Sequence, residues 1–177
     1  MSAFSEMAPE DFKISPFEMI GQEWMLIAAE KEGRTNAMTA AWGGFGFMWR
    51  RKVAFIVVRP QRFTKQFIDA SGTFSLNFFG SGQRELLNYF GTVSGRDEDK
   101  IAKSGLSVAH RNGGPYFPEA ETVIICKKLY AQAYRGECFV DPQPDLDCYP
   151  AKDYHTLYIG EVLSILARQN AANRQET

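Results

Sequence analysis

The sequence has little cysteine, no long apolar run and no excess of charge, and each shortage excludes a class of protein. Its three cysteines are odd in number and form no CxxC pair, which argues against a disulfide framework or a zinc site and favours reduced thiols. No stretch of about 18 apolar residues is present, which excludes a membrane-spanning helix, and the amino end lacks the pattern of a signal peptide. The net charge of −1 gives no general attraction to nucleic acid or anionic lipid. We therefore expect a cytoplasmic protein with neither a nucleic-acid nor a membrane partner.

The common motifs of phosphate binding and hydrolysis are missing too. The sequence contains no GxGxxG after a strand, no GxxxxGK[ST], no HExxH and no GxSxG. The glycine-rich fragment GGFGF lacks the spacing of a phosphate loop. Neither a Ser/His/Asp arrangement nor a pair of carboxylates is supported, so we predict no metal site and no side-chain nucleophile.

Length and composition fit a single domain. A chain of 177 residues with 45% hydrophobic residues is long enough to bury a core. It has no internal repeat, linker or break in composition, so we predict one domain over residues 1–177 with a core of about residues 15–166. Residues 1–10 and the tail from about Arg168 are polar or mixed, and we expect both ends to be loosely ordered.

Between the ends, the hydrophobic pattern predicts strands more than helices. Residues 53–59 are apolar and β-branched, as in a strand covered on both faces, whereas residues 73–79 alternate like a half-buried strand. Gly160 indicates a bulge, or a close approach by another backbone, in the last strand. The predicted strands cover residues 24–31, 36–42, 53–59, 73–79, 122–134 and 155–166.

The helices are predicted to be short. Thr64 resembles the N-cap of one helix, and residues 84–90 place apolar side chains on one side of another. Ser94 and Asp97 resemble a capping box for a third helix that ends at Gly105. Because strands and helices do not alternate, the pattern favours a mainly β fold, a β-barrel with helical decorations, over a doubly wound sheet.

Residues 36–44, NAMTAAWGG, carry few bulky side chains. The alanines and glycines would let a flat ligand lie against the backbone, whose N–H groups can meet the acceptor atoms of a ring. The alternative is a small-residue strand that packs tightly against a neighbour.

Two further segments combine positive charge with the start of a helix. In residues 59–64, RPQRFT, two arginines flank a rigid proline, and guanidinium groups beside helix-start N–H groups suit a phosphate monoester. Residues 94–100, SGRDEDK, add a hydroxyl, a guanidinium and an ammonium. The alternative for both segments is a solvated charged surface.

His155 is the one histidine on a predicted strand. With a period of two it shares a face with Leu157 and Ile159, so partial burial is expected. A lone histidine is more often structural than catalytic, and both interpretations stay open from its position. His110 lies in a polar loop and receives no role.

Four segments in this order, NAMTAAWGG, VRPQRFT, GTVSGRDEDK and DYHTLYIGEV, resemble the flavin reductase-like family, including its flavoredoxin group. The similarity covers roughly residues 15–166. The resemblance implies a six-stranded Greek-key split β-barrel that binds FMN non-covalently near the interface of a homodimer. The residues that it implies for the isoalloxazine ring are Asn36, Met38, Thr39, Ala40, Ala41 and Trp42. Those implied for the ribityl chain and phosphate are Arg59, Pro60, Arg62, Phe63, Thr64, Ser94, Gly95, Arg96 and Lys100.

The resemblance also implies an activity. It suggests an FMN-dependent NAD(P)H oxidoreductase in which His155 faces the ring and orients the nicotinamide, with free flavin, a quinone or a protein as acceptor. Residues 138–149 would form a flap near the site. Two alternatives stay open: an electron carrier of the flavoredoxin type without its own NAD(P)H activity, and a non-catalytic split-barrel binding module.

Overall fold

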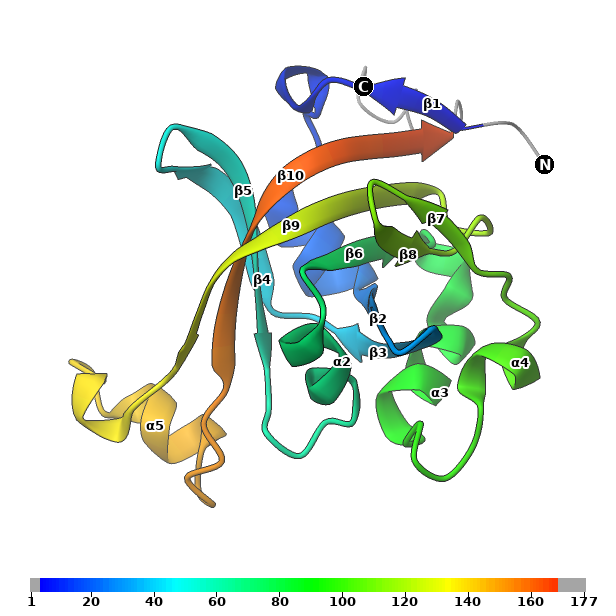
Figure 1. Ribbon diagram of the computed structural model, residues 1–177. Helices are drawn as coiled ribbons and strands as arrows, with labels where there is room; N and C mark the ends of the chain where they lie inside the picture. Colours follow the sequence, from blue (N-terminus) through cyan, green and yellow to red (C-terminus); the bar gives the residue numbers. More distant parts are fainter. Residues whose placement is uncertain (1–3, 169–177) are drawn as a thin grey trace.

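The fold is built around one antiparallel sheet, which Figure 1 shows as strongly curved. The structure, a computed structural model, describes residues 4–168. The hydrogen-bonded order is β3-β2-β6-β9-β10-β5-β4, and β1 pairs with the end of β10. The strands of this sheet are β1 (Phe4–Met7), β2 (Met25–Lys31), β3 (Arg34–Ala40), β4 (Gly43–Met48), β5 (Arg51–Val58), β6 (Thr73–Phe78), β9 (Thr122–Ala133) and β10 (Thr156–Arg168).

The remaining elements are short. A separate hairpin consists of β7 (Ala109–Arg111) and β8 (Gly114–Tyr116). The α-helices are α1 (Pro16–Glu18), α2 (Thr64–Ala70), α3 (Arg84–Thr92), α4 (Lys100–Ser104) and α5 (Gln143–Cys148). Single helical turns are η1 (Pro9–Asp11), η2 (Met19–Glu23), η3 (Ser81–Gln83) and η4 (Gly136–Cys138). The expectation of a mainly β protein with short helices is confirmed.

The predicted number of six sheet strands is wrong, because the sheet has eight within residues 4–168. The two unforeseen strands are β4, whose sequence GGFGFM is rich in glycine, and β1, which lies in a polar stretch. Strands β3 and β4 form the two edges of the sheet, and within residues 4–168 no ladder joins them.

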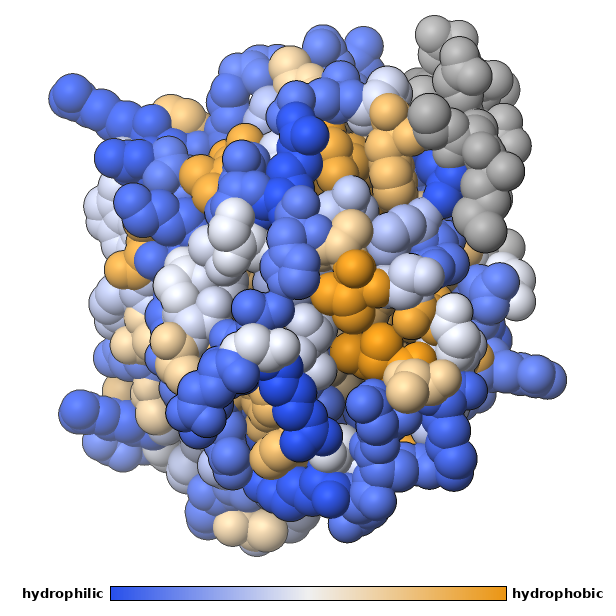
Figure 2. Space-filling view, turned by 45° about the vertical axis from the view of Figure 1, so that its right-hand side comes forward, coloured by the Kyte–Doolittle hydropathy of each residue, from blue (hydrophilic) through white to orange (hydrophobic). Residues whose placement is uncertain are grey.

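Both faces of the sheet bury apolar side chains. Along β2, Met25 and Ile27 belong to one cluster, and Leu26 and Ala28, which alternate with them, belong to the other. Helix α2 adds apolar side chains to the first cluster and α3 adds them to the second. Burial of each such large side chain contributes roughly 1.5–3 kcal/mol. On the face shown in Figure 2, hydrophilic residues surround smaller areas of hydrophobic ones.

The pairing of β10 confirms one expectation, the bulge at Gly160, and shows that another, about the amino end, is wrong. The register between β10 and β9 shifts at Ile159/Gly160, so the expected bulge is present. The close neighbour of Gly160 is the Phe74 side chain, whose Cζ would lie 2.7 Å from an added Cβ atom, and not another backbone. By contrast, the expectation of a loose end is wrong for residues 4–7, because Phe4–Met7 pairs residue by residue with the end of β10, while residues 1–3 lie outside the described part. Arg168 is itself in this ladder, whereas residues 169–177 lie outside the described part.

Two predicted caps are also wrong. Thr64 is the first residue of α2 rather than its N-cap, and its hydroxyl accepts a hydrogen bond from Asn36. Helix α4 begins at Lys100, and its N-cap is Asp99, whose carboxylate accepts from the Ala102 N–H. Ser94 lies in the preceding turn, and the predicted end of this helix at left-handed Gly105 is confirmed.

Candidate functional site

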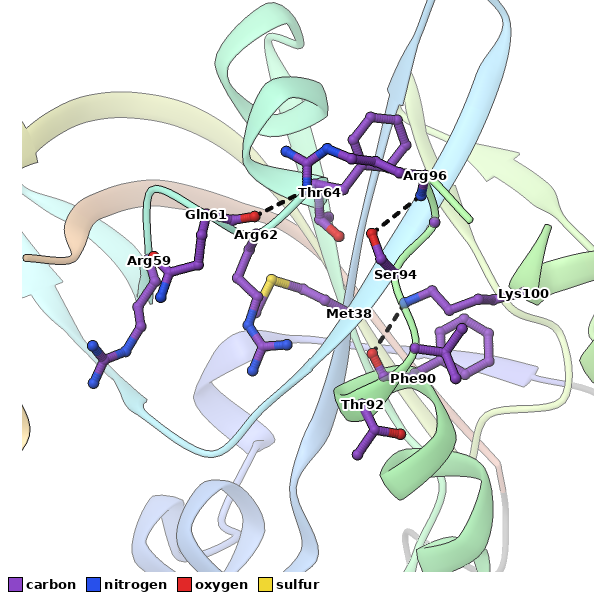
Figure 3. Close-up of a pocket in the computed structure, with 13 residues that line it drawn as sticks. Met38, Arg59, Gln61, Arg62, Thr64, Phe90, Thr92, Ser94, Arg96 and Lys100 are labelled. Atoms are coloured by element: carbon purple, nitrogen blue, oxygen red, sulfur yellow. Dashed lines mark hydrogen bonds between the residues drawn. The ribbon is translucent and has the colours of Figure 1, made fainter. Parts of the chain in front are cut away.

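Two hollows share a wall beside the β3 edge of the sheet. The larger, about 370 Å³ and called the basic pocket here, lies between β3, the turn from β5 into α2, and the loop between α3 and α4 (Figure 3). Its lining residues are Met38, Arg59, Gln61, Arg62, Phe63, Thr64, Phe90, Thr92, Val93, Ser94, Gly95, Arg96 and Lys100. Three segments that are distant in the sequence therefore meet around one space, as the sequence analysis expected.

Lys100 is an unusual component of this wall because it is almost wholly buried, with 4% of its surface exposed. Within residues 4–168 its ammonium has one acceptor, the Phe90 carbonyl at 3.0 Å, and the Phe90 ring lies 4.9 Å away. Burial, and then the nearby Arg62, lower the pKa of Lys100 to about 8. At neutral pH the pocket thus holds a desolvated cation with unused donors.

Two further basic side chains of this pocket, Arg62 and Arg96, are held in place by carbonyl groups rather than by acids. Arg62 donates to the Gly91 carbonyl at 2.6 Å, and Arg96 donates to the Gln61 carbonyl at 3.1 Å. In the described residues, neither arginine forms an ion pair with a carboxylate, and neither does Lys100. Glu98, the acid that acts on Lys100, is already bonded to Lys103 and Tyr89. The pocket therefore carries uncompensated positive charge, which favours an anion.

Asn36 fixes the shape of the basic pocket although it does not line it. Its side-chain amide donates to Thr64 Oγ1 at 2.8 Å, which ties β3 to the start of α2. Its oxygen lies so close to Gly95 that a Cβ atom there would collide with it. Glycine is needed in this turn because the turn lies directly against Asn36 of β3. Asn36 thus bonds to one neighbouring wall of the pocket and packs against the other.

The smaller hollow, about 180 Å³ and called the aromatic pocket here, adjoins the basic pocket through Met38, Arg59 and Arg62. Its lining residues are Met38, Thr39, Ala40, Ala41, Trp42, Val57, Arg59, Arg62 and His155. The alanines leave the backbone accessible, and the Trp42 and His155 rings lie with centroids 5.1 Å apart. Thr39 directs its hydroxyl to the Leu87 carbonyl at 2.5 Å, so its role is to attach α3.

His155 is buried, with 8% exposed, immediately before β10. Its Nδ1 atom lies 2.8 Å from the Tyr149 hydroxyl. Burial lowers the pKa of His155 to about 4, and the neighbouring cations Arg59 and Arg62 act in the same direction while Asp153 opposes them. The imidazole is therefore neutral at physiological pH.

Arg59 differs from the expectation for a phosphate ligand. Its guanidinium donates to Asp153 at 2.5 Å and to the Cys148 carbonyl at 2.7 Å, and it lies over the Tyr149 ring. In Figure 3 it points away from Lys100. Although Arg59 lines both pockets, its charge is already balanced by a carboxylate.

The structure brings together all but two of the residues that the resemblance implied. The exceptions are Asn36 and Pro60, which line neither pocket. Asn36 still contributes indirectly, through its bond to Thr64 of the basic pocket. Two residues of the site, Tyr149 and Asp153, had no individual role in the sequence-based prediction. Asp153 stands in the DYHTLYIGEV segment two residues before His155, which was the available signal. Tyr149 ends the segment predicted as a flap near the site, and its contact with His155 agrees with that placement.

Other kinds of site find little support in the described chain. No group of three or more His, Cys, Asp or Glu side chains within residues 4–168 is arranged to hold a metal ion. None of the helices in that range has the length and apolar character needed to span a bilayer.

The family and the fold are shown by comparison with known proteins. Residues 18–175 match the model of the flavin reductase-like domain. A curated relative, an uncharacterized protein from Aeropyrum pernix, is 26% identical over 103 residues, or 56% of this chain, and the match spans only 39% of that protein's length.

Solved structures share the fold at low identity. An FMN-binding domain of a flavin reductases-like enzyme from Shewanella baltica OS155 superposes with a TM-score of 0.71 and 19% identity, over 99% of this chain and 83% of that one. Flavoredoxin from Methanosarcina acetivorans gives 0.67 and 19%, over 83% and 69% of the two chains. An NADH:FAD oxidoreductase from Streptomyces globisporus C-1027 gives 0.61 and 18%, over 84% and 76%. Because the family model extends over most of the chain and includes every residue of both pockets, the protein belongs to the family of flavin reductase-like domains.

Proposed function

We propose that the protein is an FMN-dependent oxidoreductase that takes hydride from NAD(P)H and passes electrons to an acceptor such as free flavin, a quinone or a protein. The observation that carries the proposal is the junction of two unlike pockets. One contains three cations without acidic partners in the described chain, Arg62, Arg96 and Lys100, and the adjoining one is lined by alanine backbone and two aromatic rings. A ligand with an anionic tail and a flat ring system matches both.

The residues present fit FMN. Lys100, Arg62 and Arg96 would hold the phosphate, because their charge within the described chain is not balanced by carboxylates. The backbone from Met38 to Trp42 would lie along the ring system. When bound, FMN supplies the hydride-accepting chemistry. The chain itself would bind and orient the cofactor and shield it from water. This is consistent with the absence of a recognisable nucleophile from the sequence.

The test is an absorbance spectrum of the purified protein, reconstituted with FMN, before and after addition of NADH or NADPH. We expect the oxidised flavin band near about 450 nm to bleach with at least one donor. Uptake of FMN without bleaching by either donor would contradict the reductase and support an electron carrier of the flavoredoxin type. Failure to take up FMN would contradict both and support a non-catalytic binding module.

We also propose that the protein is a homodimer with the cofactor near the interface. Exposed aromatic side chains gather on the β4–β5 hairpin, where Phe47 is 70% and Trp49 54% exposed, and Trp49 contacts Tyr130 of β9. Trp42, which lines the aromatic pocket, is also 46% exposed. Exposed aromatic residues of this kind are typical of subunit interfaces.

Light scattering coupled to gel filtration tests this proposal. The wild-type protein should elute with twice the mass of the chain, and the double variant Phe47→Ser/Trp49→Ser should shift toward the monomer. Val140→Ser, at a fully exposed position away from the hairpin, is the matched control and should stay dimeric. A monomeric wild-type protein would contradict the proposal.

A further inference from the structure

The contact between Tyr149 and His155 is the most specific polar interaction that the proposed function leaves without a role. The Tyr149 hydroxyl and His155 Nδ1 are 2.8 Å apart, and the two rings meet edge-on at 83°. Tyr149 is 3% exposed. A buried hydrogen bond between two titratable side chains, one of which lines a pocket, restricts which proton positions are available.

Counting donors and acceptors decides the direction of this bond. Within the described chain, the Tyr149 hydroxyl has His155 as its one polar partner. If His155 carried its proton on Nδ1 and donated it, the Tyr149 hydrogen would be buried without an acceptor, which is costly. If Tyr149 donates, its hydroxyl hydrogen and the Nδ1 atom of His155 are both satisfied, and the imidazole proton is on Nε2. That atom makes no bond to the described protein, and His155 lines the aromatic pocket.

The surroundings keep both groups uncharged, as this arrangement requires. Arg59 and Arg62 line the pocket with His155, and these two cations oppose a positive charge on its imidazole. Asp153 acts the other way, but its carboxylate is shared by Arg59 and Gln61. For Tyr149, whose ring centroid lies 5.1 Å from the Arg59 guanidinium, that cation favours the charged form, and burial outweighs it. In agreement with this, the pKa of His155 is lowered to about 4, and burial raises the pKa of Tyr149.

Tyr149 is itself held rigidly. Its N–H donates to the Asp145 carbonyl at the end of α5, and its ring packs against Phe139 and Tyr154, with centroids 5.7 and 5.1 Å away. Arg59 binds the carbonyl of the preceding residue, Cys148. Arg59 therefore anchors the segment that presents the hydroxyl, which explains why its guanidinium is turned from the basic pocket.

We propose that Tyr149 is a positioning residue that keeps neutral His155 in the tautomer with its proton on Nε2, so that the imidazole offers a fixed N–H donor to a carbonyl or carboxamide oxygen in the aromatic pocket. The identity of that ligand, a nicotinamide carboxamide, rests on the proposed function, whereas the tautomer does not. A neutral donor orients such an oxygen without adding a further cation beside Arg62.

The deciding measurement is the two-bond ¹H–¹⁵N spectrum of the imidazoles at pH 7, recorded on the protein without ligand. The chain has only two histidines, and His110→Gln assigns the signals. We expect His155 to show a protonated Nε2 and an unprotonated Nδ1 in the wild type, and averaged signals in Tyr149→Phe. Tyr154→Phe, which removes a hydroxyl from the same aromatic cluster, is the control and should keep the wild-type pattern. A wild-type proton on Nδ1, or an unchanged pattern in Tyr149→Phe, would overturn the proposal.

A kinetic measurement on the flavin-loaded protein tests the donor role separately. Loss of one oriented neutral hydrogen bond should raise the KM for NAD(P)H by about two- to tenfold in Tyr149→Phe, with a smaller change in kcat. An unchanged KM would overturn the donor role. Because the spectrum needs neither FMN nor NAD(P)H, a failure of the proposed function and a failure of the tautomer assignment give different results.

Discussion

The basic pocket and the aromatic pocket share Met38, Arg59 and Arg62, but they differ in the groups that each has alone: the unbalanced cations Lys100 and Arg96 in the first, and neutral His155 in the second. In the basic pocket, Lys100 and Arg62 are held by carbonyl groups and keep their charge unbalanced. Beside the aromatic pocket, Arg59 is paired with Asp153, and His155 is kept neutral. The difference assigns separate tasks: the first pocket provides binding energy for an anion, and the second provides shape and fixed donors for a neutral ring.

The same comparison separates two arginines that look equivalent in the segment RPQRFT. Arg59 directly precedes Pro60, and Arg62 follows it by two residues. In the structure only Arg62 faces Lys100, while Arg59 secures the segment between α5 and β10 through Asp153 and the Cys148 carbonyl. Proximity in sequence therefore does not imply a common ligand.

Replacing Lys100 should have the largest effect. In Lys100→Met the ammonium is lost while an unbranched side chain of similar length remains, so FMN affinity should fall by about one to two orders of magnitude. The melting temperature should change little, because the desolvation cost of the buried charge disappears together with its one hydrogen bond. Calorimetric titration and thermal unfolding measure the two quantities.

The matched control is Lys103→Met, one turn further along α4. Lys103 is exposed and pairs with Glu98. Its replacement should leave FMN affinity unchanged, and an equal loss in both variants would show that general charge, rather than the basic pocket, governs binding.

The pH dependence of binding should be the next largest effect. The pKa of Lys100 is about 8 in the free protein, and a bound phosphate would raise it, so binding favours the protonated form. Affinity should therefore be highest below about pH 8 and fall by up to about tenfold per pH unit above it. Titrations with FMN between about pH 7 and pH 9.5 measure this slope. In Lys100→Met the slope should vanish, and a slope that persists there would assign it to another group.

Arg59→Ala should have the smallest effect on FMN affinity, less than about threefold, because its charge is already balanced by Asp153. It should instead lower the free energy of unfolding by about 1–3 kcal/mol through the hydrogen bonds that it loses. Asp153→Asn should likewise lower the free energy of unfolding and change FMN affinity little. A loss of FMN affinity in Arg59→Ala as large as that in Lys100→Met would remove the distinction between the two pockets.

The sequence predicted most strands of the fold because alternation and β-branched runs report burial directly. It did not predict β4, because three of the six residues in GGFGFM are glycines, which are depleted in strands, or β1, because its pairing depends on the distant end of β10. Thr64 and Ser94 have the chemistry of helix caps, but Asn36 engages Thr64 and Asp99 caps α4 instead. Local propensity cannot reveal which tertiary partner a polar side chain will find.

The residues of the candidate site were largely predicted, but their roles were not. The resemblance identified the segments that meet, and it grouped Arg59 with the phosphate ligands. Only three-dimensional contacts show that Arg59 pairs with Asp153 and that Tyr149 bonds to His155. Asp153 and Tyr149 both lie in the irregular connection between α5 and β10. Hydrophobic periodicity gives no information about such a connection.

The most direct test of the account compares the affinities of FMN and riboflavin for the wild-type protein by calorimetric titration at about pH 7, where the FMN phosphate is mostly dianionic. The two ligands share the ring system and differ in the phosphate. The account predicts that FMN binds at least about tenfold more tightly, and that Lys100→Met removes most of this difference. Equal affinities in the wild type would contradict the assignment of the basic pocket to a phosphate.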